Sequence, residues 1–477
     1  MARQNTPRRT FLKGIGAASV GTALASGSAG ASLPLVDDVL NLTSEDPQEV
    51  LIVFDSTDDI SLLSGLNLVD GFVGLNVLPI GYTRLTGSQI EEVASWDAVR
   101  RVEANKELDY HNADAREVTG VSTVQSDLGY TGEKVHTAVI DSGISGLHPD
   151  HQVNLQHNYR YLNPLGSSET TFWTDVGNID TDDNGHGTHT SGSIAGDGTN
   201  TAENRGMAPN ADLTVYSAGL TLLIIHAVSA LDHLISERLA GNTDAQIVSN
   251  SYGSASADDY DPDAALNVAT WEAFQAGILP VFSAGNSGPA TNTLNDYAKA
   301  PHVLSVAATD DQKAVTDFSS RGRASSYSGE TNYDRQTAFE NLSAYHAGES
   351  VSGPVGLYRN GVGAPGNAVV STLSPLDPLN ATGDGNDLYY GPLSGTSMSC
   401  PVTAGIATLM VDAYYDATGS YPEPLGVLNT IEATATEARE TYTPANIGAG
   451  FVDAEAAVSR AANGDFATFS EVSIVSE

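Results

Sequence analysis

Four short segments carry residues that together could hydrolyse an acyl bond. In chain order they hold Asp141, His186, Asn286 and Ser397. A serine attacks a carbonyl when an imidazole takes its proton, a carboxylate orients that imidazole, and an amide donates to the oxyanion that forms. The residue types therefore predict a serine nucleophile, a histidine general base, an orienting aspartate and an asparagine oxyanion donor.

The serine segment runs from Gly395 to Pro401, and the apolar spacing from Val402 to Tyr415 predicts a buried helix after it. Ser397 is therefore expected at a helix N-terminus, where free N–H groups and the helix dipole stabilise negative charge. Pro401 is expected in the first turn of that helix. Taken alone, the segment could also be an ordinary serine N-cap.

The candidate base, His186, stands between Gly185 and Gly187, which leave room around the imidazole. Its near-neutral pKa suits a general base. His189 is the rival base one helical turn further on, and we expect it to be structural. A two-histidine metal site is the third interpretation, but the glutamate of the zinc-protease helix pattern is missing.

The other two residues follow candidate strands. Asp141 ends the β-branched run Val135–Ile140, and Asn286 lies on a Gly-rich turn after Ile278–Phe282. In doubly wound sheets, sites lie beyond the carboxyl ends of strands. Each signal is weak by itself, because Asp and Asn are common in ordinary turns.

From about residue 117, buried-strand candidates alternate with helical stretches. Strands are expected at Val135–Ile140, Ile247–Val248, Ile278–Phe282 and Val303–Ala307, and helices at Leu222–Leu239 and Ala264–Ala276. This alternation predicts an α/β fold, a doubly wound and mostly parallel sheet with helices on both faces. Residues 321–350 and 373–390 are interpreted as polar loops beside the site.

A smaller α+β unit is predicted ahead of this domain, at residues 48–111. Strands are expected at Glu49–Phe54, Gly71–Pro79 and Val99–Leu108, and a helix capped by Ser88 at Gly87–Trp96. Its position before the first catalytic motif favours an inhibitory propeptide over a generic accessory domain. Processing is expected near Tyr110–Arg116, giving a catalytic domain of residues 112–477.

The N-terminus predicts export. Paired arginines in Pro7–Lys13 precede a weakly apolar stretch, Gly14–Ala29, and a small-x-small site at Ala29–Ala31. The pattern resembles a twin-arginine signal, so residues 1–31 are interpreted as a signal peptide and 32–47 as a linker. We expect a secreted protein with no membrane anchor, since the apolar stretch is short and rich in small residues.

The composition is strongly acidic. Asp and Glu number 59 against 21 Lys and Arg, a formal charge of -38 over 477 residues. Such a charge disfavours nucleic acid or an anionic membrane as a partner. Because the acids are spread along the chain, they predict a halophilic surface whose self-repulsion salt would screen. Cys400, the single cysteine, excludes an intrachain disulfide and is interpreted as a packing residue, with a redox-sensitive role as the alternative.

Together the motifs resemble the subtilisin family of serine proteases. The matching segments are Val139–Gly143, Gly185–His189, Ala284–Asn286, and Gly395–Met398 with Pro401. The resemblance extends over about residues 117–460, and the acidity and signal are similar to those of halolysin-type subtilases. Residues 321–360 stand out as an insertion relative to the family pattern.

The resemblance implies roles for individual residues. Ser397 would attack the peptide carbonyl, His186 would transfer the proton, and Asp141 would orient His186. Asn286 and the backbone N–H of Ser397 would hold the oxyanion. Ser251-Tyr252-Gly253 matches the segment that pairs with the substrate backbone, which implies broad specificity.

The resemblance also implies structural calcium and no catalytic cofactor. Candidate acids are Asp180, Asp182 and Asp183, and the cluster Asp258, Asp259, Asp261 and Asp263. They do not form an EF-hand pattern, so no metal ligands are assigned. Expected partners are protein and peptide substrates and the chain's own propeptide, with the enzyme a self-processed monomer. The alternatives are a dedicated maturation protease and an inactive peptide-binding scaffold.

Overall fold

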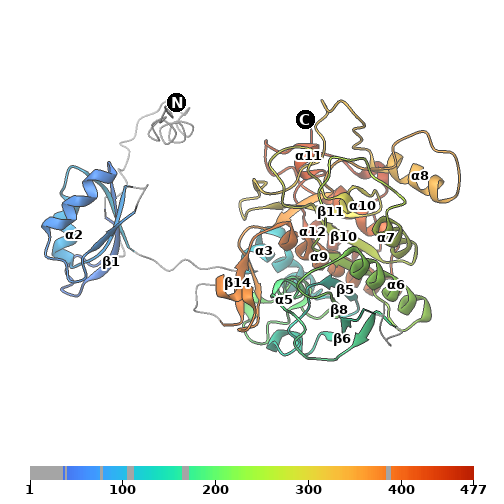
Figure 1. The fold of residues 1–477 in the computed structure, drawn as a ribbon, viewed down its shortest axis with the longest axis horizontal. Helices are drawn as coiled ribbons and strands as arrows, with labels where there is room; N and C mark the ends of the chain where they lie inside the picture. The colour runs from blue at the N-terminus through green and yellow to red at the C-terminus, as the bar shows by residue number, and fades with distance from the viewer. Residues whose placement is uncertain are drawn as a thin grey trace. The chain divides into compact units, whose positions relative to one another are not determined.

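The computed structural model describes residues 36–37, 40–75, 79–104, 112–163, 171–382 and 388–476. The chain divides into two compact units, Met1–Asp109 and Tyr110–Glu477 (Figure 1). The predicted signal peptide lies outside the described residues, and so do residues 105–111, where part of the predicted processing window falls. No helix in the described ranges has the length and apolarity that crossing a membrane requires.

In its described residues, the first unit is a four-stranded antiparallel sheet with two short helices. Its strands, in the order β2-β3-β1-β4, are β1 (Gln48–Phe54), β2 (Phe72–Gly74), β3 (Ile80–Leu85) and β4 (Val99–Ala104). Alternate residues of β1 (Val50, Ile52 and Phe54) are buried with the apolar faces of α2 (Gly87–Ala94) and the 3-10 helix η1 (Thr57–Gly65). The predicted α+β class of this unit is confirmed.

Two local predictions for this unit are wrong. The strand expected over Gly71–Pro79 is shorter, since β2 covers only Phe72–Gly74, and β3, which begins at Ile80, was not predicted. The cap of α2 is Thr86 and not Ser88, because Thr86 accepts from the backbone N–H of Gln89 while Gln89 reaches back. This reciprocal capping box fixes the helix start two residues earlier.

The second unit is built on an eight-stranded sheet. In the order β12-β11-β10-β9-β5-β8-β6-β7, every neighbouring pair is parallel except β6 and β7. The strands are β5 (His136–Asp141), β6 (Leu155–Tyr161), β7 (Trp173–Asp175), β8 (Asp212–Ser217), β9 (Ile247–Asn250), β10 (Leu279–Ser283), β11 (Leu304–Thr309) and β12 (Val362–Pro365). A separate antiparallel pair joins β13 (Val369–Thr372) to β14 (Tyr390–Leu393).

Helices cover both faces of this sheet. The α-helices in the described part of this unit are α3 (Asn112–Thr119), α4 (Val121–Thr123), α5 (His186–Ala195), α6 (Ile224–Ala240), α7 (Ala265–Gln275), α8 (Arg335–His346), α9 (Thr396–Thr418), α10 (Pro424–Thr434), α11 (Pro444–Ile447) and α12 (Ala454–Ala461). On β5, Val139 packs in the core formed with α9, whereas Ala138 and Ile140 pack in the core formed with α6 and α7. A parallel strand that is buried on both faces has a continuous apolar sequence, as β5 does. The predicted doubly wound fold is confirmed.

The sheet order places a switch point at β5. Strand β8 pairs with one edge of β5 and β9 with the other. The strands β5 and β9 are neighbours, and the loops that follow their carboxyl ends lead away in opposite directions. α/β folds form their binding crevice between two such loops. Asp141 is the last residue of β5, and Ser251 follows the last residue of β9.

Two further predictions need correction. Residues 321–350 are not only a loop, because α8 forms within them. Its start is capped by Asp334, and its Phe339 packs on Trp271 and Phe274. Pro401 lies inside α9, at its sixth residue and not in the first turn.

Candidate active site

Asp141 and His186 are brought together at the carboxyl end of β5. His186 Nδ1 lies 2.7 Å from Asp141 Oδ1. Asp141 is 3% exposed, and its Oδ1 also accepts from the backbone N–H of Ser142, while Oδ2 accepts from Thr190 Oγ1. A buried carboxylate with these donors is held in one orientation, so it fixes the plane of the imidazole.

The glycines beside His186 permit close packing of the backbone. Gly187 needs to be a glycine because a Cβ there would lie 2.1 Å from the carbonyl oxygen of Gly143 in the Asp141 turn. Gly185 has a φ of 101°, which a residue with a side chain rarely adopts. The first N–H of α5, that of His186, donates to Asn184 Oδ1 at 2.7 Å.

The pKa values of the two histidines of this helix are shifted in opposite directions. Burial lowers the pKa of His186, but the charge and hydrogen bond of Asp141 outweigh it, so the pKa is raised above its ordinary value. Burial, and next the charge of His186, lower the pKa of His189 to about 3. His189 Nε2 donates to the carbonyls of Val369 and Gly391. These contacts support the structural interpretation of His189.

Ser397 is the second residue of α9 and contacts the segment after β9. Its Oγ donates to the carbonyl of Ser251 at 3.2 Å, and Ser251 Oγ donates to the carbonyl of Ser397 at 2.9 Å. In this arrangement the nucleophile candidate is bonded to Ser251 and not to His186. Helix α5, which begins with His186, packs directly on α9.

Asn286 is oriented by the same helix start. Its Oδ1 accepts from the backbone N–H of Thr396 at 2.9 Å and from Thr396 Oγ1 at 3.0 Å. Since the oxygen is taken by two donors, the Nδ2 group is left as a donor toward the side of Gly395. The amide and the N-terminus of α9 thus offer N–H groups in one place.

In the predicted substrate segment, Ser251 is buried, Tyr252 is half-buried and Gly253 is exposed. Within the described residues, the N–H and C=O of Gly253 make no hydrogen bond. Beside the segment lies a cavity of about 210 Å³, lined by Tyr252, Gly253, Ser254, Leu222, Ile224, Ala227, Leu266 and Tyr297. Sequence analysis missed this apolar cavity, although Leu222–Ile225 is a mostly exposed apolar run at the start of α6.

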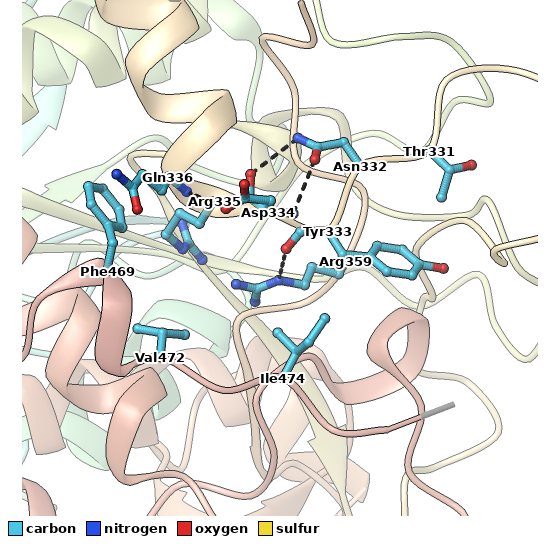
Figure 2. Close-up of a pocket in the computed structure, with 10 residues that line it drawn as sticks. All are labelled: Thr331, Asn332, Tyr333, Asp334, Arg335, Gln336, Arg359, Phe469, Val472 and Ile474. Atoms are coloured by element: carbon cyan, nitrogen blue, oxygen red, sulfur yellow. Dashed lines mark hydrogen bonds between the residues drawn. The ribbon is translucent and has the colours of Figure 1, made fainter.

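A larger cavity of about 430 Å³ lies elsewhere, between residues 331–336 and the C-terminal segment (Figure 2). Its two guanidinium groups, from Arg335 and Arg359, both bond the buried carboxylate of Glu432. Arg359 also donates to the carbonyl of Tyr333, and Arg335 to that of Val303. These donors are occupied by structural contacts, so this cavity is not the reaction site.

Three of the acids considered for calcium are bonded to protein groups. Asp182 accepts from the backbone N–H of Thr188 and Gly185, and Asp259 pairs with Arg323. Asp263 accepts from the hydroxyl of Tyr345. Across the described residues, no group of three or more His, Cys, Asp or Glu gathers as a metal site would need. No calcium ligands are assigned in these two segments.

Cys400 is fully buried under the strand ends. Its Sγ approaches the carbonyls of Val281 and Asn250 at 3.5 and 3.7 Å. Burial raises the pKa of the thiol to about 11, which keeps it protonated and unreactive. The packing interpretation of Cys400 is supported.

Comparison with known proteins identifies relatives that match most of the second unit. The model of the subtilase family matches residues 132–450. The serine protease AprX of Bacillus subtilis strain 168 is 28% identical over 377 residues, covering 76% of this chain and 74% of the relative. Subtilisin DY of Bacillus licheniformis is 27% identical over 347 residues, covering 71% of this chain and 97% of the relative.

Solved structures agree on the fold. Sphericase superposes with a TM-score of 0.52 at 24% identity, covering 71% of this chain and 97% of that chain. The S41 psychrophilic protease gives 0.51, also at 24% identity, covering 70% and 97%. At this identity the likeness supports the architecture of the second unit.

Proposed function

The chain belongs to the subtilase family of serine endopeptidases, and we propose that Asp141, His186 and Ser397 form its catalytic triad, with Asn286 as an oxyanion donor. The observation that carries the proposal is the 2.7 Å contact between His186 Nδ1 and the buried Asp141 carboxylate. This contact assigns the Nδ1 proton to the Asp141 side, which leaves Nε2 as the base.

In the proposed reaction, Ser397 Oγ exchanges its acceptor from the Ser251 carbonyl to His186 Nε2 and attacks the peptide carbonyl. His186 takes the hydroxyl proton, and Asp141 stabilises the imidazolium. Asn286 Nδ2 and the N–H of Ser397 donate to the oxyanion. The imidazolium then protonates the leaving amine, and a water hydrolyses the acyl-enzyme by the same proton path.

The substrate backbone is proposed to pair with Ser251 and Gly253 as an added strand. The free N–H and C=O of Gly253 suit this pairing, which reads backbone groups and gives broad specificity. A substrate side chain would enter the apolar cavity beside Tyr252, so we expect apolar residues to be favoured there. Cleavage-site profiling on a denatured proteome tests this. One narrow motif would instead support the dedicated maturation protease.

The central test is cleavage of casein by wild type and by Ser397→Ala, with labelling by a phosphonyl fluoride. Wild type should cleave and be labelled at Ser397, whereas the variant should do neither. Ser399→Ala is the matched control, since Ser399 is a buried serine in the same helix whose hydroxyl donates to the carbonyl of Thr396. An unlabelled, inactive wild type would support the peptide-binding scaffold.

We further propose that the first unit is an inhibitory propeptide removed by self-processing. From Asn112 onward the chain is helix α3, and Arg116 is buried and donates to the carbonyl of Glu203. Cleavage is therefore proposed before Asn112, at the N-terminal side of the predicted window. N-terminal sequencing should find a mature start there for wild type and an unprocessed chain for Ser397→Ala. Maturation of the pure variant would refute self-processing.

From the sequence we also propose secretion by the twin-arginine route, a monomeric state and a halophilic surface. The charge of -38 supports the halophilic one, because salt would screen self-repulsion. Activity should fall on dilution into low salt, and full activity there would contradict it. The calcium that the family resemblance implies is tested by adding EDTA at constant ionic strength and following thermal unfolding.

A further inference from the structure

One buried amide joins the substrate segment to the oxyanion turn. Asn295 is 1% exposed, and its Nδ2 donates to the carbonyl of Tyr252 at 2.9 Å and to the carbonyl of Ser283 at 2.9 Å. Ser283 ends β10, directly before Ala284-Gly285-Asn286. The two hydrogens of one amide group therefore serve two functional segments.

The main chain of Asn295 adds a second tie to the oxyanion turn. Its N–H donates to the carbonyl of Ala284 at 2.8 Å, and its Oδ1 accepts from the N–H of Tyr297. An isolated antiparallel bridge also pairs Asn295 with Ala255, just beyond the substrate segment. The side chain is thus anchored on every polar atom and cannot rotate without breaking these contacts.

The contact reaches the inner edge of the substrate segment. Along an extended chain, successive carbonyls point to opposite edges. Asn295 holds Tyr252 from inside, which leaves Ser251 and Gly253 facing outward. The carbonyl of Ser251 indeed meets Ser397 Oγ. A substrate pairing with Ser251 and Gly253 would therefore lie on a strand whose opposite edge Asn295 fixes.

Packing around Gly253 shows how close this approach is. A Cβ at Gly253 would lie 2.1 Å from Asn295 Nδ2. Only a glycine allows the amide to reach the neighbouring carbonyl at hydrogen-bond distance. The glycine of the substrate segment and the buried asparagine form one unit.

We propose that Asn295 is a positioning residue that sets the spacing between the substrate-binding strand and the oxyanion donor Asn286. The inference rests on the proposed serine endopeptidase function. Pairing with Ser251 and Gly253 fixes the position of the scissile carbonyl of a bound peptide. Because Asn295 bonds both the substrate strand and the oxyanion turn, it holds that position beside the oxyanion donors. A substrate too short to pair with the strand gains nothing from this alignment.

The test compares an acyl amino-acid anilide with a tetrapeptide anilide of the same terminal residue. Asn295→Ala should lose roughly 10- to 100-fold in kcat/KM on the tetrapeptide, mainly in kcat, and far less on the short substrate. Asn295→Asp keeps the size but has no amide hydrogens, so it should behave in the same way. Active-site titration with the phosphonyl fluoride corrects for any unfolded fraction.

Asn154→Ala is the matched control. Asn154 is 4% exposed, and its Nδ2 also bridges two carbonyls, those of Ala195 and Pro209, away from the substrate segment. This variant should lose about as much stability as Asn295→Ala. It should keep the wild-type ratio of kcat/KM on the tetrapeptide anilide to kcat/KM on the acyl amino-acid anilide. In Gly253→Ala the added methyl group would clash with the amide of Asn295, so this variant should show the same fall in the ratio of kcat/KM values as Asn295→Ala.

Two outcomes would overturn the inference. One is an Asn295→Ala enzyme that titrates as active and keeps the wild-type ratio, and the other is an equal loss of ratio in Asn154→Ala. If wild type hydrolyses neither substrate, the proposed function itself fails, which is a separate result.

Discussion

The hydroxyl of Ser251 donates to the carbonyl of Ser397, which lies in the first turn of α9 and lacks its usual helical donor. That donor would be the N–H four residues later, and position 401 is a proline. A proline inside the helix therefore frees a backbone oxygen beside the nucleophile. The freed oxygen ties the nucleophile to the substrate segment.

This relationship predicts a non-additive pair of substitutions. Ser251→Ala should lower the free energy of unfolding by about 1–3 kcal/mol, because it leaves a buried carbonyl unpaired. In the Pro401→Ala background the alanine supplies an N–H to that carbonyl, so Ser251→Ala should cost less by about 1 kcal/mol. Urea unfolding in the Ser397→Ala background, which prevents autolysis, measures the cycle. Simple additivity would show that the two donors do not share one acceptor.

A second prediction concerns Asp182. Burial lowers the pKa of His186 and Asp141 raises it, and the charge of Asp182 raises it further by a smaller amount. Asp182→Asn removes a negative charge, which favours the neutral imidazole, so the pKa should fall. The acidic limb of the kcat/KM profile should then move to lower pH than in wild type. Asp183→Asn, an exposed neighbour with the same charge change, should leave the limb in place. A shift to higher pH would contradict the assignment of His186 as the base.

A third prediction concerns Asp377 on the loop that meets the His186 turn. Burial, with the charges of Asp182 and Asp180, raises its pKa from 3.8 to about 7. Between these values the folded state holds a proton that the unfolded state has lost, so stability falls as pH rises through this window.

Asp377→Asn mimics the protonated acid and should remove this pH dependence. It should be more stable than its parent by at least about 1 kcal/mol at pH 8, with the difference vanishing near pH 4. Thermal unfolding at several pH values, in the Ser397→Ala background, checks this. Asp311→Asn, an exposed acid, controls for net charge. An equal gain in that variant would assign the effect to overall repulsion.

The catalytic candidates were predictable because their signals are local. Asp141 follows an apolar strand run, and the glycines around His186 record close backbone contacts. The fold class follows equally from the alternation of strands and helices. Strand ends and helix starts carry their own composition, so one sequence suffices to find them.

What was missed depends on contacts distant in sequence. Asn295 resembles a turn asparagine until Tyr252 and Ser283 are placed beside it. Helix α8 has little apolar periodicity, because it packs through few residues such as Phe339 and Leu342. Its formation depends on the surface that α7 provides, which no local pattern encodes.

The last prediction concerns the insertion, which is anchored by a buried ionic cluster. Glu432 of α10 is fully buried between Arg335 and Arg359, with contacts of 2.6 and 2.8 Å (Figure 2 shows the two arginines). Burial raises the pKa of Glu432, but the two arginine charges outweigh it and lower the pKa to about 2. Its stabilising contribution is therefore present above its ordinary pKa and is lost as pH falls through about 2.

Glu432→Gln should lower the free energy of unfolding by about 3–5 kcal/mol, because it leaves two buried guanidinium groups without a counter-charge. The exposed pair Lys134–Asp416, with contacts of 2.6 Å and side chains 40% and 54% exposed, is the control. Asp416→Asn should change stability by less than about 1 kcal/mol, since water already screens that pair. Urea unfolding of both variants in the Ser397→Ala background measures the difference. Equal small effects would mean that the backbone carbonyls around Arg335 and Arg359 suffice to hold their charge, and the insertion would then be anchored by its apolar contacts with α7.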